Sequence, residues 1–187
     1  MGVHADALAV LGQWAPDDRE QESLRQAYLG FLAAREDSCD RSCAAGHITA
    51  SAVVLDGDNV LLTLHPRVGK WLQLGGHCEP SDQTLAGAAL REATEESGID
   101  GLTIDPVPMH LEVHPITCSL GVPTRHFDVR FAVHAPAGAQ PVRSDESDDL
   151  RWWPISEVPN ADLLPMISLA TSRGSHAARN GDRAGAW

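Results

Sequence analysis

Apolar and polar residues alternate along several segments of the chain, as they do in strands with one buried face. Two such segments, one starting at His47 and one at 60–65, are separated by the turn sequence Asp-Gly-Asp-Asn, which predicts neighbouring strands. Shorter strands are predicted at 71–74, in the second half of 103–116 and at 150–153. The strongest alternation lies in 124–135, with Phe127, Val129, Phe131 and Val133 on one face and His126, Asp128, Arg130 and Ala132 on the other.

Residues 1–45 predict an N-terminal extension of two helices. The first covers 4–14 and ends before the following proline, because the residue before a proline avoids the helical conformation. The second is capped by Asp17 or Asp18 and continues to about Arg35. We expect the pair to pack on the main domain; the alternatives are that it shapes substrate access or forms a homodimer contact. The apolar face of the second helix consists of Leu24, Tyr28, Phe31 and Leu32.

One longer helix interrupts the predicted strands, from about Gln83 to Ser97, and a shorter one follows the last strand. Strands on both sides of a central helix, with another helix closing the domain, favour an α/β fold: a mixed β-sheet sandwiched by helices. We assign this main domain to residues 46–170. Residues 171–187 are rich in Gly, Ala, Arg and Ser, so we expect a disordered tail there.

Composition limits the classes of partner. The chain has 187 residues, 43% of them hydrophobic, and a formal net charge of −12. That charge disfavours binding to nucleic acid or to an anionic membrane surface. No apolar run approaches the length of a transmembrane helix, and the N-terminus lacks the basic start of a secretory signal. We therefore expect a soluble, cytoplasmic protein.

Three carboxylates lie within five residues near the end of the predicted central helix. Glu92, Glu95 and Glu96 are three or four residues apart or adjacent, so they share one side of the helix. Clustered anions repel one another unless a cation lies among them, and oxygen ligands of this kind suit Mg²⁺ or Mn²⁺. Gly98 supplies the left-handed residue that ends the helix. An amphipathic surface helix with solvated acids is the alternative, but it leaves the preceding Gly-Gly turn unexplained.

The stretch from Gly76 to Ile99 resembles the Nudix box. In that motif a glycine, five residues, a glutamate and seven residues precede Arg-Glu-apolar-x-Glu-Glu-x-Gly-apolar. The second half of the motif matches at every position from Arg91 onward. The first half departs from it, because Asp82 stands where a glutamate is expected and one additional residue lies between Asp82 and Arg91.

The resemblance implies an α/β/α sandwich of the Nudix type and a set of roles. It implies that Glu95 and Glu96 are metal ligands and that Glu92 is a third ligand or the general base. In this family the carbonyl of the residue before the box glycine, which is Gly75 here, often joins the metal shell. Arg91 would orient an acid, for which Asp82 is the candidate, and not contact the substrate. Some members complete the site with an acid from a later loop, for which Glu146 is the candidate, although a solvated acidic loop is the alternative.

Residues that flank the box are candidates for binding the substrate. They are basic side chains or imidazoles that could contact phosphates or a base: His65, Arg67, Lys70 and His77. For each of them, an exposed or purely structural role is the alternative. Trp71 could stack on a base, but packing in the core is the simpler interpretation.

The predicted function is hydrolysis of a diphosphate linkage that depends on Mg²⁺ or Mn²⁺. The substrate would be a small molecule, either a nucleoside diphosphate-linked compound or a nucleoside triphosphate, and water activated by the metal would attack phosphorus. Two alternatives keep the fold without hydrolysis: a diphosphate isomerase and a nucleotide-sensing module. The isomerase chemistry needs a well-placed cysteine, and neither Cys78 nor Cys118 has the expected context.

The spacing Cys39-x₃-Cys43-x₃-His47 raises the question of a zinc site. It is wider than the usual Cys-x₂-Cys, and no fourth ligand is evident. We therefore expect reduced thiols in this segment and no zinc bound by it.

Overall fold

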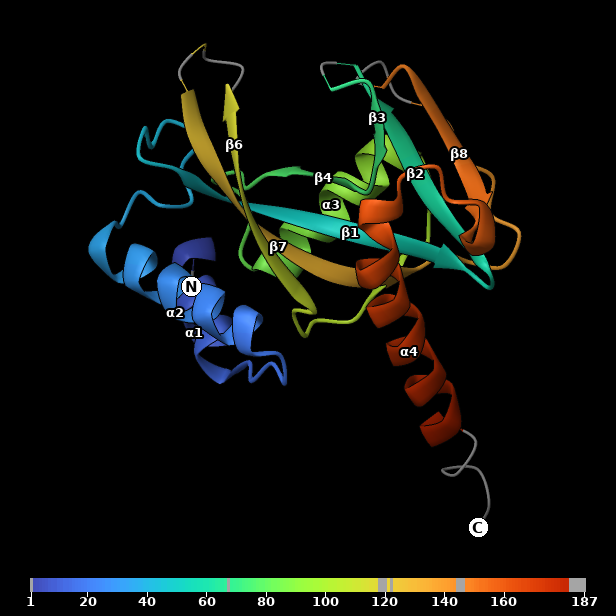
Figure 1. Ribbon diagram of the computed structural model, residues 1–187, viewed down its shortest axis with the longest axis horizontal. Helices are drawn as coiled ribbons and strands as arrows, with labels where there is room; N and C mark the ends of the chain where they lie inside the picture. Colours follow the sequence, from blue (N-terminus) through green and yellow to red (C-terminus); the bar gives the residue numbers. More distant parts are fainter. Residues whose placement is uncertain (1, 67, 118–120, 122, 144–146, 182–187) are drawn as a thin grey trace.

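The computed structural model describes residues 2–181 except 67, 118–120, 122 and 144–146 (Figure 1). The helices are α1 (Val3–Gln13), α2 (Arg19–Ala34), α3 (Leu85–Ser97) and α4 (Leu164–Gly181), with short 3₁₀ turns at Ile155–Glu157 and Ala161–Leu163. The strands are β1 (His47–Asp56), β2 (Asn59–His65), β3 (Lys70–Leu72), β4 (Leu74–His77), β5 (Thr103–Ile104), β6 (His110–Thr117), β7 (Pro123–His134) and β8 (Asp149–Pro154).

The strands form one mixed sheet centred on β1. β1 pairs parallel with β7 and antiparallel with β2 and β4, while β6 and β5 pair with β7, and β3 and β8 pair with β2. The register sets His47 opposite His126 and Thr49 opposite both Asp128 and His77. The predicted mixed sheet is therefore confirmed, and its register aligns polar residues from three strands.

Helices cover both faces of this sheet (Figure 1). On one face, Ala52 and Val54 of β1 pack with Ala93 of α3. On the other face, Val53 and Leu55 pack with the α4 region, including Met166 and Ile167. This arrangement is the α/β/α sandwich predicted from the sequence.

The second face of β1 changes character along the strand. Val53 and Leu55 lie under α4, whereas His47, Thr49 and Ser51, which precede them on the same face, are buried polar residues. Buried polar groups need partners or a water-filled space. This polar half of the face borders the cavity described below.

The N-terminal helices pack on the main domain, as predicted. The Tyr28 hydroxyl of α2 donates hydrogen bonds to the carbonyls of Glu112 (2.7 Å) and Asp128 (2.9 Å). The side-chain amide of Gln21 donates a hydrogen bond to the carbonyl of Leu111 and accepts one from the N–H of the same residue. Asp6 of α1 accepts a hydrogen bond from the backbone N–H of Leu85 at 2.8 Å, so α1 supplies an anion at the N-terminus of α3.

The Tyr28 hydroxyl gives a direct test of this packing. We expect Tyr28→Phe to lower the free energy of unfolding by about 1–2 kcal/mol, because two buried carbonyls lose their shared donor. Chemical denaturation followed by circular dichroism measures the change. A variant as stable as the unmodified protein would show that the N-terminal helices contribute little through this residue.

Two helices differ from the prediction. Helix α3 begins at Leu85, because the Thr84 side chain caps it by accepting from the N–H of Gly87. Helix α4 extends to Gly181, whereas composition favoured an unstructured tail from Thr171; the last six residues lie outside the described range. None of the helices in the described part of the chain is long and apolar enough to cross a membrane.

Candidate active site

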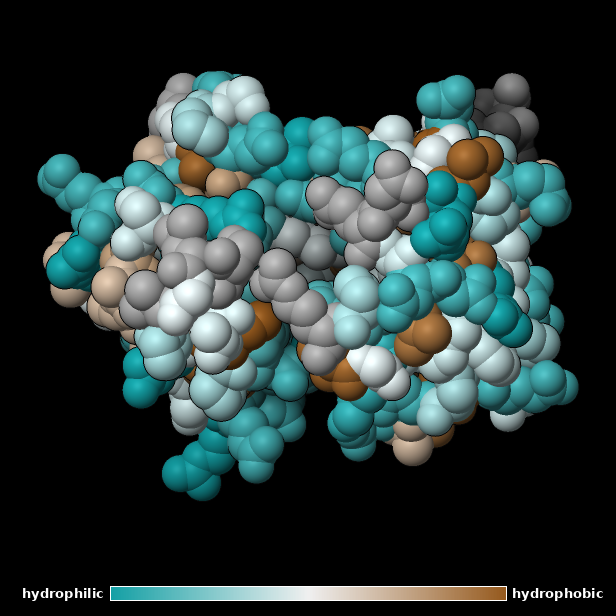
Figure 2. Space-filling view, turned by 90° about the horizontal axis from the view of Figure 1, so that it is seen from above, coloured by the Kyte–Doolittle hydropathy of each residue, from teal (hydrophilic) through white to brown (hydrophobic). Residues whose placement is uncertain are grey.

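A cavity of about 1940 Å³ opens between the β6–β7 arm of the sheet and β2–β3. Its floor is the polar half of β1 with β4, its side includes the acidic edge of α3, and α1 and α2 contribute Val3, His4 and Gln21 to its border. Figure 2 looks onto this end of the molecule, where hydrophilic residues surround a hollow near the middle. The N-terminal helices therefore also border the access to the site.

Helix α3 brings the predicted acids to this cavity. Glu92, Glu95 and Glu96 all line it, together with Gly75 and Gly76 of β4. The helix is fixed at both ends, by the Thr84 cap and by Gly98 in the left-handed conformation (φ 61°). Its other side is buried through small residues such as Ala89 and Ala93, which keep α3 close to the sheet.

Arg91 lies at the centre of the acidic cluster and contacts several of its carboxylates. Its guanidinium donates to both carboxylate oxygens of Asp82 (3.2 and 3.1 Å) and to the carbonyl of His77 (2.9 Å). The same side chain contacts Glu92 at 3.1 Å and Glu95 at 3.0 Å. The predicted pairing of Arg91 with Asp82 is therefore present. These partners raise the pKa of Arg91, with Asp82 contributing most, so the group stays charged.

Gly75 and Gly76, which the sequence placed in a turn, lie in strand β4, and neighbouring atoms leave no space for a side chain at either position. Gly75 has φ +145°, and a Cβ there would lie 2.5 Å from the Cα of Ser51. A Cβ on Gly76 would lie 2.7 Å from the carboxylate atoms of Glu92. The Gly75 N–H donates to Glu96 at 3.3 Å. The acids of α3 thus reach the cavity across a strand that has no side chains in the way.

The close approach of Glu92 to Gly76 leads to a prediction. We expect Gly76→Ala to lower kcat/KM by about tenfold or more, because the new methyl displaces the Glu92 carboxylate. The melting temperature should change little, since a flexible side chain can move aside. Gly30→Ala on α2, where a Cβ meets nothing within 4 Å, is the matched control. Equal activity of the two variants would contradict the assigned position of Glu92.

The donor set fits a hard divalent cation. The carboxylates of Glu92 and Glu96 lie with Gly75 at one wall of the cavity, and carboxylate oxygens are the hard ligands that Mg²⁺ or Mn²⁺ prefers. The space above Gly76 is filled by the Glu92 carboxylate, and Glu95 is the most exposed acid, with 60% of its side chain accessible. The residues for which the resemblance predicts metal binding, Gly75, Glu92, Glu95 and Glu96, therefore line one cavity.

A second polar group in the cavity was not singled out from the sequence. Asp128 of β7 is fully buried; it accepts hydrogen bonds from Ser51 (2.6 Å) and Thr49 (3.0 Å) and pairs with Arg130 at 2.9 Å. Burial raises the pKa of Asp128 and lowers that of Arg130 to about 10. Arg130 also pairs with Glu112 of β6. The sequence did carry a signal for this pair. The polar side of the alternating segment 124–135 includes charged residues, which is unusual for a strand in the middle of a sheet.

The other predicted residues divide into two groups. His65, Lys70 and His77 line the cavity, so the structure brings them together with the acids. Arg67 and Glu146 lie outside the described residues. Trp71 packs edge-on against Trp153 (centroids 5.2 Å apart) with Arg151 over its ring, which agrees with a packing role.

Cys39, Cys43 and His47 do not form a common metal-binding group among the described residues. The Cys39 thiol interacts with Cys78, and this contact lowers the pKa of Cys39. His47 approaches the backbone carbonyl of Cys43 (3.4 Å) with its Nδ1 atom. Cys78 is buried, and the hydrogen bond to Cys39 and burial both raise its pKa, which disfavours a thiolate. Cys118 lies outside the described residues.

Half-buried histidines make stability depend on pH. Burial, followed by neighbouring His77 and His47, lowers the pKa of His126 from 6.5 to about 3, and burial with Arg130 lowers that of His110 to about 4. Below pH 6.5 the unfolded chain takes up protons that the folded chain does not, so stability is complete above that pH and is lost as the pH falls.

We expect the metal-free protein to be less stable toward urea at pH 5.5 than at pH 7.5, and His126→Gln to reduce the difference. Urea unfolding in EDTA at both pH values is the measurement. A free energy of unfolding that stays constant over this interval would show that these imidazoles are not buried in neutral form.

Comparisons with known proteins agree with this fold. The NUDIX domain family matches residues 46–169. A NUDIX-family hydrolase from Clostridium perfringens is 26% identical, covers 67% of this chain and 94% of its own, and has a TM-score of 0.49. The dihydroneopterin triphosphate pyrophosphohydrolase of E. coli is 22% identical over 63% of this chain and 90% of its own, with a TM-score of 0.49. No curated protein sequence gives a match.

One further solved structure, a UDP-X diphosphatase, is 18% identical, with a TM-score of 0.50. The similarity covers 92% of this chain and 93% of that one, so it includes most of the N-terminal extension and shows a common fold for it. The fold of the main domain is therefore of the Nudix type. The chain belongs to the Nudix family, as its match over residues 46–169 shows.

Proposed function

We propose that this protein hydrolyses a diphosphate linkage in a nucleoside diphosphate-linked compound or a nucleoside triphosphate, using Mg²⁺ or Mn²⁺. The observation that carries the proposal is the convergence of Glu92, Glu95 and Glu96 on a cavity that also contains Lys70 and His65. Acids alone would repel a polyphosphate. The combination of carboxylates for cations with basic side chains nearby suits a substrate that carries phosphates.

Each residue has a definite part in this proposal. Glu92, Glu96 and the Gly75 carbonyl would hold the divalent ions, and Glu95, the most exposed acid, would complete the set. When bound, such ions neutralise phosphate charge and lower the pKa of a water molecule. Arg91 is a positioning residue, because its guanidinium is held by Asp82 and His77 and in turn fixes Glu92.

The Asp82 carboxylate is best explained as the support of Arg91. Its side chain is only 7% exposed, and one oxygen accepts from the N–H of Glu79 at 2.7 Å. An aspartate in place of a glutamate has a shorter reach, which is enough for Arg91 from the loop before α3. We therefore assign Asp82 no contact with substrate.

A hydrolase is favoured over the two alternatives without hydrolysis. A diphosphate isomerase would need a reactive thiol, whereas Cys78 is buried against Cys39 and its pKa is raised. A sensing module would not need Arg91 together with Glu92, Glu95 and Glu96, all of which line one cavity here. We infer a small-molecule substrate; residues His65, Lys70 and His77 are candidates for contacts with it.

Product release across a panel of substrates tests the proposal. Nucleoside triphosphates, nucleoside diphosphate sugars, ADP-ribose and dinucleoside polyphosphates would be incubated with the protein in Mg²⁺, in Mn²⁺ and in EDTA, and the products separated by chromatography. We expect one class to yield a nucleoside monophosphate only when a divalent ion is present. Absence of turnover on every class, or equal turnover in EDTA, would overturn the proposal.

A further inference from the structure

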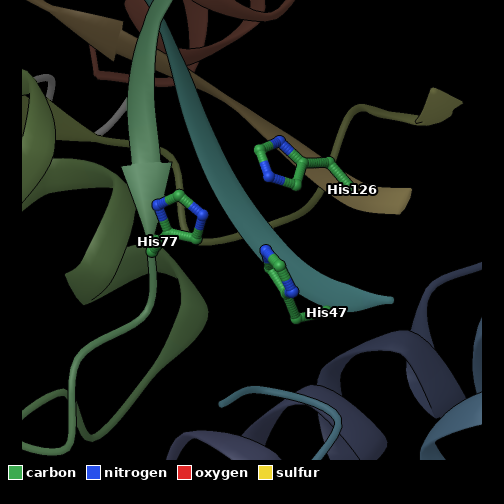
Figure 3. A group of neighbouring side chains, drawn as sticks. All are labelled: His47, His77 and His126. Carbon is green, nitrogen blue, oxygen red and sulfur yellow. The ribbon is translucent and has the colours of Figure 1, made fainter. Parts of the chain in front are cut away.

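Three histidines from three strands face one another beside the acidic site (Figure 3). His47 starts β1, His77 ends β4 and His126 lies on β7. One ring nitrogen from each lies within 4.8 Å of the other two. The ring centroids are 4.9–5.0 Å apart in all three pairs. The sheet register explains the arrangement, because His47 is opposite His126 and His77 is opposite Thr49, two residues along the same face.

His47 is buried, His77 and His126 are half-buried, and the polar atoms of the cluster are incompletely satisfied. His47 is only 1% exposed. The Nε2 atoms of His47 and His126 are inaccessible and have no hydrogen-bond partner among the described residues. A buried polar atom without a hydrogen-bond partner costs free energy, and binding of an ion is one of the standard explanations for such an atom. No carboxylate belongs to the cluster itself, so ion pairing within it does not explain why the three imidazoles lie together.

We propose that His47, His77 and His126 bind a transition-metal ion, for which Zn²⁺ is the natural occupant. Neutral imidazole is a preferred ligand of Zn²⁺, and three protein ligands with one open position are typical of zinc sites that are not purely structural. This site is distinct from the acidic one, whose hard oxygen ligands suit Mg²⁺ or Mn²⁺. It is also distinct from the Cys39-Cys43-His47 spacing, since neither thiol belongs to the cluster.

The geometry is close to what a bound ion requires. Zn–N bonds of about 2.0–2.1 Å in a tetrahedral site place the nitrogens about 3.4 Å apart, so the triangle needs to contract by about 1.4 Å at most. His47 already has the second-shell contact common in zinc sites, because its Nδ1 approaches the Cys43 carbonyl at 3.4 Å and leaves Nε2 for the ion.

The open position would face the cavity. His77 and His126 line the cavity, whereas His47 lies behind them. A fourth ligand can therefore come from water or from an oxygen of a molecule in the cavity. His77 also connects the two sites through the backbone, since its carbonyl accepts from Arg91 at 2.9 Å.

Cobalt provides the test, because Co²⁺ in a tetrahedral site absorbs visible light strongly. The untagged full chain, freed of metal with a chelator, would be titrated with Co²⁺ and then with Zn²⁺. We expect tetrahedral absorbance that saturates at one Co²⁺ per chain and that Zn²⁺ abolishes; Co²⁺ at the oxygen ligands of the acidic site would not give this signal. His77→Gln and His126→Gln should each weaken binding by at least about tenfold, the scale of losing even a supporting contact.

Two controls make the titration specific. His110→Gln removes another half-buried cavity histidine, which contacts Arg130 and lies outside the cluster, and should bind Co²⁺ as the unmodified chain does. The double variant Glu92→Gln/Glu96→Gln removes the acidic site and should also keep the absorbance. Loss of the signal in the double variant, or its retention in both His77→Gln and His126→Gln, would overturn the proposal.

X-ray absorption at the zinc edge tests the unmodified chain and does not depend on the folding of any variant. We expect a first shell with three nitrogens at about 2.0 Å and the outer-shell scattering of imidazole. A shell of sulfur, or of oxygen without imidazole, would overturn the assignment. So would the absence of stoichiometric Zn²⁺ binding. The outcome is independent of the proposed hydrolase activity, since it measures metal content and not turnover.

Discussion

Replacing Glu96 by glutamine should abolish most hydrolysis while leaving the fold intact. Glu96 reaches from α3 to the Gly75 N–H, and glutamine can keep that hydrogen bond through its amide oxygen. What it loses is the negative charge that holds a divalent cation. Cation binding contributes several kcal/mol to the transition state, so we expect kcat/KM to fall by about a hundredfold or more. Steady-state kinetics at saturating Mg²⁺ measures the loss.

The control for Glu96→Gln is Glu79→Gln. Glu79 also lines the cavity and undergoes the same change of charge, but its carboxylate is 3.9 Å from Arg91 and 56% exposed. We expect Glu79→Gln to retain kcat/KM within about twofold, since a distant exposed charge contributes little. If Glu96→Gln were as active as Glu79→Gln, the assignment of Glu96 as a metal ligand would be wrong.

Removing Arg91 should destabilise the protein as well as impair catalysis. Asp82 is 7% exposed and Arg91 is 19% exposed, so Arg91→Met leaves a buried carboxylate without its partner. Breaking such a pair costs about 3–5 kcal/mol, and we expect the lower end because Arg91 keeps some contact with solvent. Chemical denaturation measures the loss. The carbonyl of His77 and the carboxylate of Glu92 lose the same donor, so activity should fall too.

Two further variants separate a buried pair from a surface one. Asp82→Asn combined with Arg91→Met should be less destabilising than the sum of the single changes, because the uncompensated charge is gone. Arg35→Met breaks an ion pair with Asp37 that is about half exposed at both ends, and its unfolding midpoint should stay unchanged. Additive effects in the first pair would show that Arg91 and Asp82 act independently.

Most of the fold could be predicted because each element carries its own pattern. The alternation in 124–135 predicted β7, and the apolar spacing that includes Tyr28 and Leu32 predicted α2. The start of α3 was less certain, since Gln83, Thr84 and Leu85 all suit the first turn and only the Thr84 side-chain hydrogen bond settles it. The helix beyond Thr171 was missed because its Gly- and Ala-rich composition is also that of a flexible tail.

The acidic site was predictable for a local reason, whereas the histidine cluster was not. Glu92, Glu95, Glu96 and Arg91 lie on one helix, so their spacing alone places them together. His47, His77 and His126 come from three strands, and only the register of β1 with β4 and β7 brings them together. The Asp128–Arg130 pair has the same origin: its partners Thr49 and Ser51 are distant in sequence.

The most direct measurement is a crystal structure of the protein grown in Mg²⁺ with a non-hydrolysable diphosphate analogue. The account predicts Mg²⁺ bound by the carboxylates of Glu92 and Glu96 at about 2.0–2.1 Å, with the same ion contacting an oxygen of the diphosphate. Carboxylates that instead point into bulk solvent, with Mg²⁺ and the analogue bound elsewhere or not at all, would contradict it.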